Sequence, residues 1–302
     1  MTYPIGTPGQ PWGETEKAQW LAKQTIQRSY QQEVVDAITA LPAALARVQY
    51  GELSYTPGRY PLLALQTPNW QPDKPLVLIT GGIHGYETSG VQGALQFARE
   101  HALDYAKSFN LLMVPCVSPW GYEVINRWNP KALDPNRSFF ADSPAEESAA
   151  LMALVAAQSQ PFLAHIDLHE TTDSDESEFR PALAARDGKV FEPGIVPDGF
   201  YVVDNSAQPQ PAFQQAIIAA VAKVTHIAPA DSDGQIIGSP VVQPGVIAYP
   251  LKTLGLCASV TGAPYTCTTE VYPDSPSATA AVCNQAQVAA LCGALAYLQQ
   301  HR

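Results

Sequence analysis

An apolar run at residues 75–80 leads through two glycines into a His-Gly-Tyr-Glu sequence at residues 84–87. The run predicts a buried strand, and the glycines predict a tight turn at its end. A strand followed by such a turn brings His84 and Glu87, three residues apart, to one point. Zinc accepts an imidazole nitrogen and a carboxylate oxygen in a roughly tetrahedral shell. Because two ligands do not hold a catalytic zinc, another segment must supply a third.

The third ligand is expected from a second apolar run, residues 162–169, which predicts another strand. His165, Asp167 and His169 are two residues apart along it and therefore share one face of the strand. Ligands in open α/β sheets gather at the carboxyl ends of the strands, which favours His169 over His165. His165 is then expected to be a core residue. Asp167 is either a partner of a ligand histidine or a hydrogen-bonded buried acid.

Predicted strands and helices alternate along most of the chain. We expect strands at residues 60–66, 75–80, 109–117, 162–169, 255–259 and 266–271, and helices at 14–47, 90–102, 146–158, 212–224 and 278–300. This alternation is typical of an α/β fold with a twisted, mostly parallel mixed sheet and helices on both faces. No linker divides the chain, so we expect a single domain.

Within this domain, residues 1–49 should form an N-terminal arm and helix packed on a main body at residues 50–302. Two long polar segments, 118–142 and 170–200, are expected to be mostly loop. Long loops inside a compact domain are often functional. The acidic residues at 173–178 are expected to form either a solvated loop or a lip that faces the substrate.

Composition excludes several function classes. The 302-residue chain has a formal net charge of −11 and a pI of about 4.9, so nucleic acid is not an expected partner. No apolar run approaches the roughly 20 residues of a membrane span, and no signal-peptide pattern begins the chain. The cytoplasm is the default location, with export by a route without a cleaved signal left open. Five cysteines in no recognisable framework are expected to be mostly buried free thiols.

The long segment after the strand predicted at 109–117 carries further candidates. It reads Ser-Pro-Trp-Gly at residues 118–121, then Arg127, then Asp-Pro-Asn-Arg at residues 134–137. Single arginines are usually solvated surface charges, but two on a loop that follows a buried strand are typical of a binding site. Near the end of the chain, Glu270 ends the strand predicted at 266–271.

Together these motifs resemble the M14 zinc carboxypeptidases over about residues 50–300. That family carries His-x-x-Glu, Asn-Pro-x-Gly, an arginine six residues later, Asp-Leu-Asn-Arg, a ligand histidine and a late glutamate. The Asp-Leu-His-Glu-Thr-Thr sequence at residues 167–172 resembles a bacterial branch that includes the rapid-encystment-type carboxypeptidases. Ser118, Pro135 and Glu170 depart from the family pattern, and Glu170 is expected to alter the neighbouring subsites.

The resemblance implies a zinc carboxypeptidase-like catalytic domain with one Zn²⁺ per chain. His84, Glu87 and His169 would be the zinc ligands, with an open position for a water whose pKa the metal lowers. Glu270 would be the general base that takes the proton of this water. Arg127 would stabilise the oxyanion formed on the scissile carbonyl group.

The resemblance also implies how the substrate is held. Asn136 and Arg137 would bind its free carboxylate, because the planar fork of arginine matches a carboxylate. Asp134 would orient a zinc-bound imidazole. Tyr249, 21 residues before Glu270, would close over the substrate, with Tyr265 as a rival for this role.

The leading expectation is therefore a zinc metallocarboxypeptidase that releases one residue from the C-terminus of a peptide. Two alternatives keep the metal: an N-acyl amino acid deacylase of the succinylglutamate desuccinylase/aspartoacylase type, and a cell-wall peptide amidase. Those deacylases usually carry an additional β-rich domain, whereas about 32 residues follow Glu270, which favours the peptidase. A non-catalytic binding module is the third alternative. The substrate is expected to be a peptide or small acylated amino acid with a free carboxylate, and the acids at 173–178 favour a C-terminal Lys or Arg.

Overall fold

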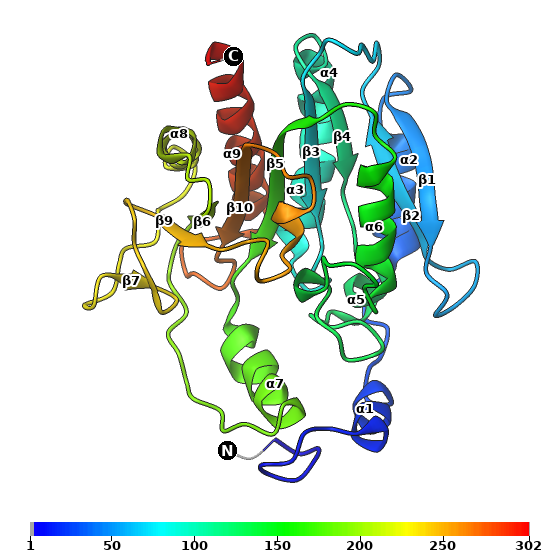
Figure 1. The fold of residues 1–302 in the computed structure, drawn as a ribbon, viewed down its shortest axis with the longest axis vertical. Coiled ribbons are helices and arrows are strands. Elements are labelled where there is room, and N and C mark those ends of the chain that lie inside the picture. Colours follow the sequence, from blue (N-terminus) through cyan, green and yellow to red (C-terminus); the bar gives the residue numbers. More distant parts are fainter. Residues whose placement is uncertain (1–2, 302) are drawn as a thin grey trace.

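The structure, a computed structural model, describes residues 3–301 of the chain. Its centre is an eight-stranded sheet with the order β1-β2-β4-β3-β5-β10-β6-β9, and a small hairpin, β7–β8, lies beside it (Figure 1). The strands are β1 (Ala46–Glu52), β2 (Pro61–Gln66), β3 (Leu76–Gly81), β4 (Asn110–Val114), β5 (Phe162–Glu170), β6 (Tyr201–Asn205), β7 (Gln235–Ile236), β8 (Ser239–Pro240), β9 (Val246–Tyr249) and β10 (Tyr265–Val271). Four of the seven neighbouring pairs in the sheet are parallel, so the predicted mostly parallel mixed sheet is confirmed.

Helices cover both faces of this sheet, as predicted. The α-helices are α1 (Glu14–Leu21), α2 (Asp36–Ala40), α3 (Thr88–Glu100), α4 (Ala102–Tyr105), α5 (Pro119–Val124), α6 (Glu146–Ala156), α7 (Arg180–Arg186), α8 (Pro211–Val221) and α9 (Ala280–Gln300). Two π-helical segments, η1 (Gln31–Val35) and η3 (Asp175–Phe179), and two 3₁₀ turns, η2 (Pro135–Arg137) and η4 (Cys257–Ser259), complete the list.

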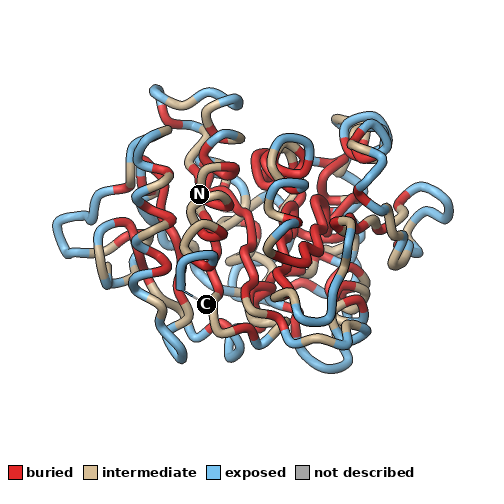
Figure 2. Tube along the Cα trace, turned by 90° about the horizontal axis from the view of Figure 1, so that it is seen from above, coloured by how far each residue is buried: buried red, intermediate tan, exposed pale blue. Residues whose placement is uncertain are grey.

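Two apolar cores lie on opposite faces of the sheet because side chains alternate along each strand. In β3, Val77 and Ile79 join the core formed with α2, α3, α8 and α9. Leu76 and Leu78 join the core formed with α6. Figure 2 shows these buried segments running through the centre of the molecule, with exposed segments outside them. Strands buried on both faces read as continuous apolar runs, which is why the central strands were predictable.

The central strands bring the site residues to one edge of the sheet. β3, β5 and β10 are adjacent and parallel, so their carboxyl ends meet at that edge. In the register of this part of the sheet, His169 of β5 lies beside Glu270 of β10. The loop that carries residues 84–87 follows β3 at the same edge.

The prediction of one helix over residues 14–47 is wrong. The structure has α1, then η1 and α2, and residues Ala46–Glu52 form β1 instead. The chain leaves the helical path after α1 because the backbone N–H groups of Gln27 and Arg28 donate to the carbonyl oxygen of Glu123. β1 pairs with β2 and spans residue 50, where the sequence placed the start of the main body.

Three other predicted segments also need correction. The strand predicted at residues 255–259 contains the 3₁₀ turn η4. The two predicted loops contain α5 and η2 in one case and η3 and α7 in the other. The strands β6 and β9 and the β7–β8 hairpin, which are two to five residues long, were not predicted.

The N-terminal arm holds α7 at the edge of the sheet where the site lies. The indole of Trp128 makes edge contacts with Trp12, Trp20 and Phe179, at centroid distances of 6.1, 5.5 and 5.6 Å. The backbone N–H of Trp12 also donates to the carbonyl oxygen of Arg186 at the end of α7. In Figure 1, α1 and α7 lie at the same end of the molecule.

One described helix, α9, is long and apolar enough to cross a membrane. Its apolar residues pack in the core with α3 and α8, so burial within the fold explains the composition. All five cysteines are free, and all except Cys292 are buried, as predicted.

We predict that Gly85→Ala prevents the loop after β3 from docking. A Cβ atom at Gly85 would lie 1.8 Å from the carbonyl carbon of Gly121 and 2.1 Å from the nitrogen of Tyr122. These are backbone atoms that cannot rotate away, so we expect the free energy of unfolding to fall by about 3 kcal/mol in chemical denaturation. Gly13→Ala is the control, since its new Cβ would meet only the side chain of Glu16, at 3.4 Å. Equal unfolding free energies for both variants would contradict the packing described.

Candidate active site

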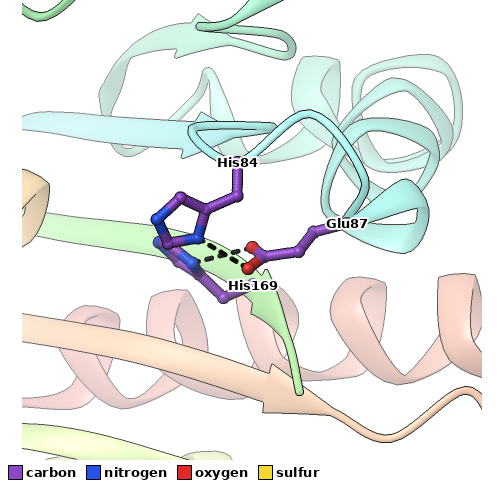
Figure 3. A group of neighbouring side chains, drawn as sticks. All are labelled: His84, Glu87 and His169. Carbon is purple, nitrogen blue, oxygen red and sulfur yellow. Dashed lines mark hydrogen bonds and ion pairs between the residues drawn. The ribbon is translucent and has the colours of Figure 1, made fainter. Parts of the chain in front are cut away.

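Three side chains converge at the carboxyl edge of β3 and β5 (Figure 3). Nδ1 of His84 lies 2.6 Å from Oε1 of Glu87, and Nδ1 of His169 lies 2.8 Å from Oε2 of the same carboxylate. Each of the three residues is 1% exposed. His84 comes from the loop after β3, Glu87 stands at the N-terminus of α3, and His169 is near the end of β5. These are the three ligands that the sequence predicted, and the structure brings them together.

Their donor atoms fit a divalent metal ion. Two imidazole nitrogens and a carboxylate oxygen lie within 4.8 Å of one another, which is a donor set that zinc accepts. Oε2 of Glu87 is buried, and no donor is aligned with it for a hydrogen bond despite the short distance to His169. A buried acceptor without an aligned donor is costly, and a cation would satisfy it.

The charges around the imidazoles point the same way. Three negatively charged carboxylates, those of Glu87, Asp134 and Asp167, contact the two rings. The positively charged guanidinium of Arg127 contacts the carboxylate of Asp134. With neutral imidazoles the cluster carries excess negative charge, which a divalent cation would offset. The same neighbouring charges shift the pKa values of His169 and Glu87. Despite burial, Glu87 and Asp167 raise the pKa of His169 well above its usual value, and the two histidines hold the pKa of Glu87 well below its usual value.

A second carboxylate contacts the Nε2 atom of each imidazole, on the side of the ring away from Glu87. Nε2 of His84 lies 3.0 Å from Oδ1 of Asp134, and Nε2 of His169 lies 2.8 Å from Oδ2 of Asp167. Both contacts leave the Nδ1 atoms facing Glu87. This arrangement fixes the ring orientation and the tautomer of a ligand histidine. Asp134 therefore lies where the resemblance predicted it, and of the two possibilities for Asp167 the structure favours the partner of a ligand histidine.

Asp167 is itself held by a buried chain of hydrogen bonds. The hydroxyl of Thr80 donates to Oδ1 of Asp167 at 2.6 Å. Since that hydroxyl has one proton, it must accept from Nε2 of His165, which lies 2.8 Å away. Burial lowers the pKa of His165 to about 4, so the ring is neutral and can hold this tautomer. His165 is thus a core residue, as the sequence predicted.

Glu270 lies at the end of β10 and lines the same cavity as the three converging residues. The hydroxyl of Thr171 donates to its Oε2 at 2.9 Å and also lies 2.8 Å from the hydroxyl of Tyr201. Burial raises the pKa of Glu270 to about 8, against the opposing effect of His169. A carboxyl group with a pKa near neutrality can both accept and return a proton.

Arg127 is placed by contacts on three sides. Its Nε donates to Oδ2 of Asp134 at 3.1 Å, and its Nη1 donates to the hydroxyl of Tyr86 at 2.9 Å. The Tyr86 hydroxyl in turn donates to Asp175 at 2.6 Å. The guanidinium also lies 4.4 Å from the ring centre of Phe179. These contacts hold Arg127 beside Glu87, at 3.9 Å.

The other three predicted substrate residues line the same cavity. The backbone N–H of Cys257 donates to the side-chain oxygen of Asn136 at 2.7 Å, which leaves the amide nitrogen 3.5 Å from Nε2 of His169. Arg137 is exposed and donates to the carbonyl oxygen of Asn136. The hydroxyl of Tyr249 accepts from Ser239 at 3.3 Å.

Sequence reasoning missed four residues that hold this site. They are Tyr86, Thr171, Asp175 and Tyr201. Asp175 was predicted within an acidic loop or lip, but it is 7% exposed and lies 3.4 Å from Arg127. Glu170 lines the cavity, in agreement with the expectation that it affects the neighbouring subsites, and both its oxygens accept backbone N–H groups at the start of α3. A pattern of residue types could not reveal these contacts, since each joins distant segments.

The cavity that contains these residues has a volume of about 420 Å³. Its walls come from α7 and the following loop on one side and from β6, β9 and the β7–β8 hairpin on the other. Cavities of this size are typical of sites for small molecules or short peptide segments.

Comparisons with known proteins agree with this geometry. The family model described as the succinylglutamate desuccinylase/aspartoacylase catalytic domain matches residues 73–190. A search of curated proteins finds no match. Among solved structures, a provisionally named metallopeptidase from Shewanella amazonensis has a TM-score of 0.67 at 20% identity, covering 91% of this chain and 99% of that one. The metallo-carboxypeptidase from Burkholderia cenocepacia has a TM-score of 0.59 at 17% identity, covering 97% and 70%.

A third solved structure contains a small ligand. It is the metallo-carboxypeptidase from Pseudomonas aeruginosa in complex with (2-guanidinoethylmercapto)succinic acid, with a TM-score of 0.58 at 14% identity, covering 97% of this chain and 70% of that one. The described chain therefore has an M14-like zinc carboxypeptidase fold, as the resemblance in its sequence implied.

We predict that Thr80→Val weakens zinc binding about tenfold while the fold is kept. The change removes the hydroxyl that donates to Asp167, so His169 loses part of the support that orients it. Zinc affinity is measured by competition with a chromogenic chelator. Thr266→Val is the control, because it removes a buried hydroxyl of β10 that is outside this chain of contacts. Unchanged affinity in Thr80→Val would show that Asp167 orients His169 without Thr80.

Proposed function

We propose that this protein is a zinc-dependent metallocarboxypeptidase that hydrolyses the C-terminal peptide bond of a peptide. The observation that carries the proposal is the buried convergence of His84, Glu87 and His169 in a cavity that Glu270 also lines. The first three offer a metal two imidazole nitrogens and a carboxylate oxygen, and the fourth is a buried carboxyl group that lines the same cavity. Hydrolysis by an activated water needs both elements in one cavity.

The bound zinc would supply a polarised water and a positive charge for the scissile carbonyl oxygen. Glu270 would accept the proton of the water and return it to the leaving amine, a role that suits its raised pKa. Arg127 would donate to the oxyanion, because Asp134 and Tyr86 fix its guanidinium beside the metal ligands. Each group would then act from a position that the free protein already holds.

The free carboxylate of the substrate would bind to Asn136 and Arg137. The amide oxygen of Asn136 is occupied by Cys257, so its NH₂ group remains available to donate to an anion. Arg137 is exposed and donates to the backbone carbonyl oxygen of Asn136, so its guanidinium can turn to a carboxylate. Tyr249, on the wall across the cavity, would close over the bound residue.

A second candidate function is hydrolysis of an N-acyl amino acid. The match of residues 73–190 to the succinylglutamate desuccinylase/aspartoacylase catalytic domain favours it. The same metal ligands and base would serve, because both reactions cleave an amide whose leaving amine carries a carboxylate. The two functions differ in the group on the acyl side, which is a peptide in one case and a small acid in the other.

The state of the cysteines bears on the location of the protein, and the proposed activity bears on its substrate. The five free cysteines are compatible with a reducing compartment, so we propose the cytoplasm. The substrate would be a small molecule or peptide with a free carboxylate.

We predict that Glu270→Gln lowers kcat on a C-terminally free peptide at least 10³-fold while zinc content is unchanged. The amide cannot accept the water proton, but it is close in shape to the carboxyl group and lies outside the ligand set.

In the unchanged protein, kcat/KM should rise with pH, because Glu270 accepts a proton only after losing its own. Activity is followed by amino acid release, and zinc by elemental analysis.

Three control measurements make this assay decisive. A chelator should abolish activity of the unchanged protein, and added zinc should restore it. Thr266→Val should keep full activity. N-acetylaspartate and N-succinylglutamate are assayed beside the peptides, so that faster hydrolysis of either one would assign the deacylase function. A Glu270→Gln variant with full activity would remove Glu270 from the mechanism.

A further inference from the structure

The turn of the β7–β8 hairpin contains a residue that does not suit its backbone. Ile236 pairs with Ser239, so Ile237 and Gly238 are the two residues of the turn. Their φ angles are +49° and +75°. Tight hairpin turns of this kind need a positive φ at both positions and favour Asn-Gly. Gly238 fits, but a β-branched residue with positive φ is strained.

Ile237 lies at the wall of the candidate active site. It lines the 420 Å³ cavity that also contains the proposed metal ligands and Glu270. It also lines a neighbouring cavity of about 440 Å³ between the hairpin and residues 193–198, and so stands on the boundary between the two. Ile125 is the other β-branched residue with positive φ among residues 3–301, and it does not line the cavity with the metal ligands. Strained backbone is typical of residues that form binding sites.

The residues of the cavity wall that belong to the same apolar cluster as Ile237 are uncharged. Val203 of β6, Tyr249 of β9 and Leu256 contribute to it, and Ile237 packs with the same apolar cluster. The charged residues of the lining that are outside the proposed catalytic group lie mainly on α7 and the loop after it. An uncharged wall binds an apolar side chain by removing its surface from water.

Of the acidic residues at 173–178, Asp175 is the one that lines the cavity with the proposed metal ligands. Asp175 is ion-paired with Arg127, and Glu176 with Arg180. The carboxylate of Asp173 accepts from the hydroxyl of Tyr272. The preference for C-terminal Lys or Arg predicted from these acids therefore finds no unpaired carboxylate of this segment in the cavity.

We propose that Ile237 is a specificity-determining residue that selects an apolar side chain on the amino acid released by the enzyme. This proposal rests on the proposed carboxypeptidase function and adds the class of side chain to it. Ile237 keeps a strained turn because its side chain completes the apolar wall of the cavity. Asparagine or glycine would relax the turn and would leave that wall incomplete.

The test compares Ile237→Asn and Ile237→Gly with the unchanged protein, all loaded with zinc. The substrates are N-blocked dipeptides that end in Phe, Leu, Ala or Lys. We expect kcat/KM for Phe and Leu, relative to Ala, to fall about tenfold or more in both variants, mainly through KM. Tm should stay the same or rise, because both residues accept a positive φ.

Val242→Asn is the matched control, since Val242 is 61% exposed near the hairpin and does not line the cavity. It should change neither the ratios nor Tm. Unchanged ratios in both Ile237 variants would overturn the proposal. A lower Tm with equal losses on all four substrates would also overturn it, because Ile237 would then be only a packing residue. If the unchanged protein hydrolyses none of the dipeptides, the carboxypeptidase function fails, and this proposal fails with it.

Discussion

The site depends on one buried carboxylate that faces two imidazoles. Glu87 lies within 2.8 Å of Nδ1 of both His84 and His169, at a position almost without solvent. Burying so many charged and polar groups is costly unless each has a partner. Asp134 and Asp167 satisfy the outer nitrogens of the rings, and a cation would satisfy the inner donors. The surrounding structure can be understood as the support for this arrangement.

That support begins with sheet topology. Parallel neighbours β3, β5 and β10 end at one edge, so three segments separated by about a hundred residues each deliver a functional group to the same place. The N-terminal arm and α7 add a wall there through contacts of Trp128 with its aromatic neighbours. The hairpin with Ile237 belongs to the opposite wall. The sheet thus fixes the chemistry, whereas the connecting segments shape the cavity around it.

The sequence predicted the parts of the structure that follow from local pattern. The strands that lead to His84 and His169 are largely apolar, and the strand that carries Glu270 is rich in β-branched threonine. The spacing of His84 and Glu87 predicted two of the three residues that converge. The sequence did not predict the partners of Arg127, because Tyr86 and Asp175 meet only when η3 folds over the loop after β3. Residues 14–47 were predicted as one helix because helical periodicity does not reveal tertiary contacts such as those with Glu123. Local pattern predicts elements, and long-range contacts decide where they break.

The most direct test of this account is a crystal structure of the zinc-loaded protein with anomalous diffraction data collected on both sides of the zinc absorption edge. The account predicts one strong anomalous peak per chain, bounded by Nδ1 of His84, Nδ1 of His169 and the carboxylate of Glu87. The peak should be absent from crystals of Glu87→Ala grown with the same zinc concentration. Zinc found only at surface residues, or a folded protein that leaves these three side chains without metal, would contradict it.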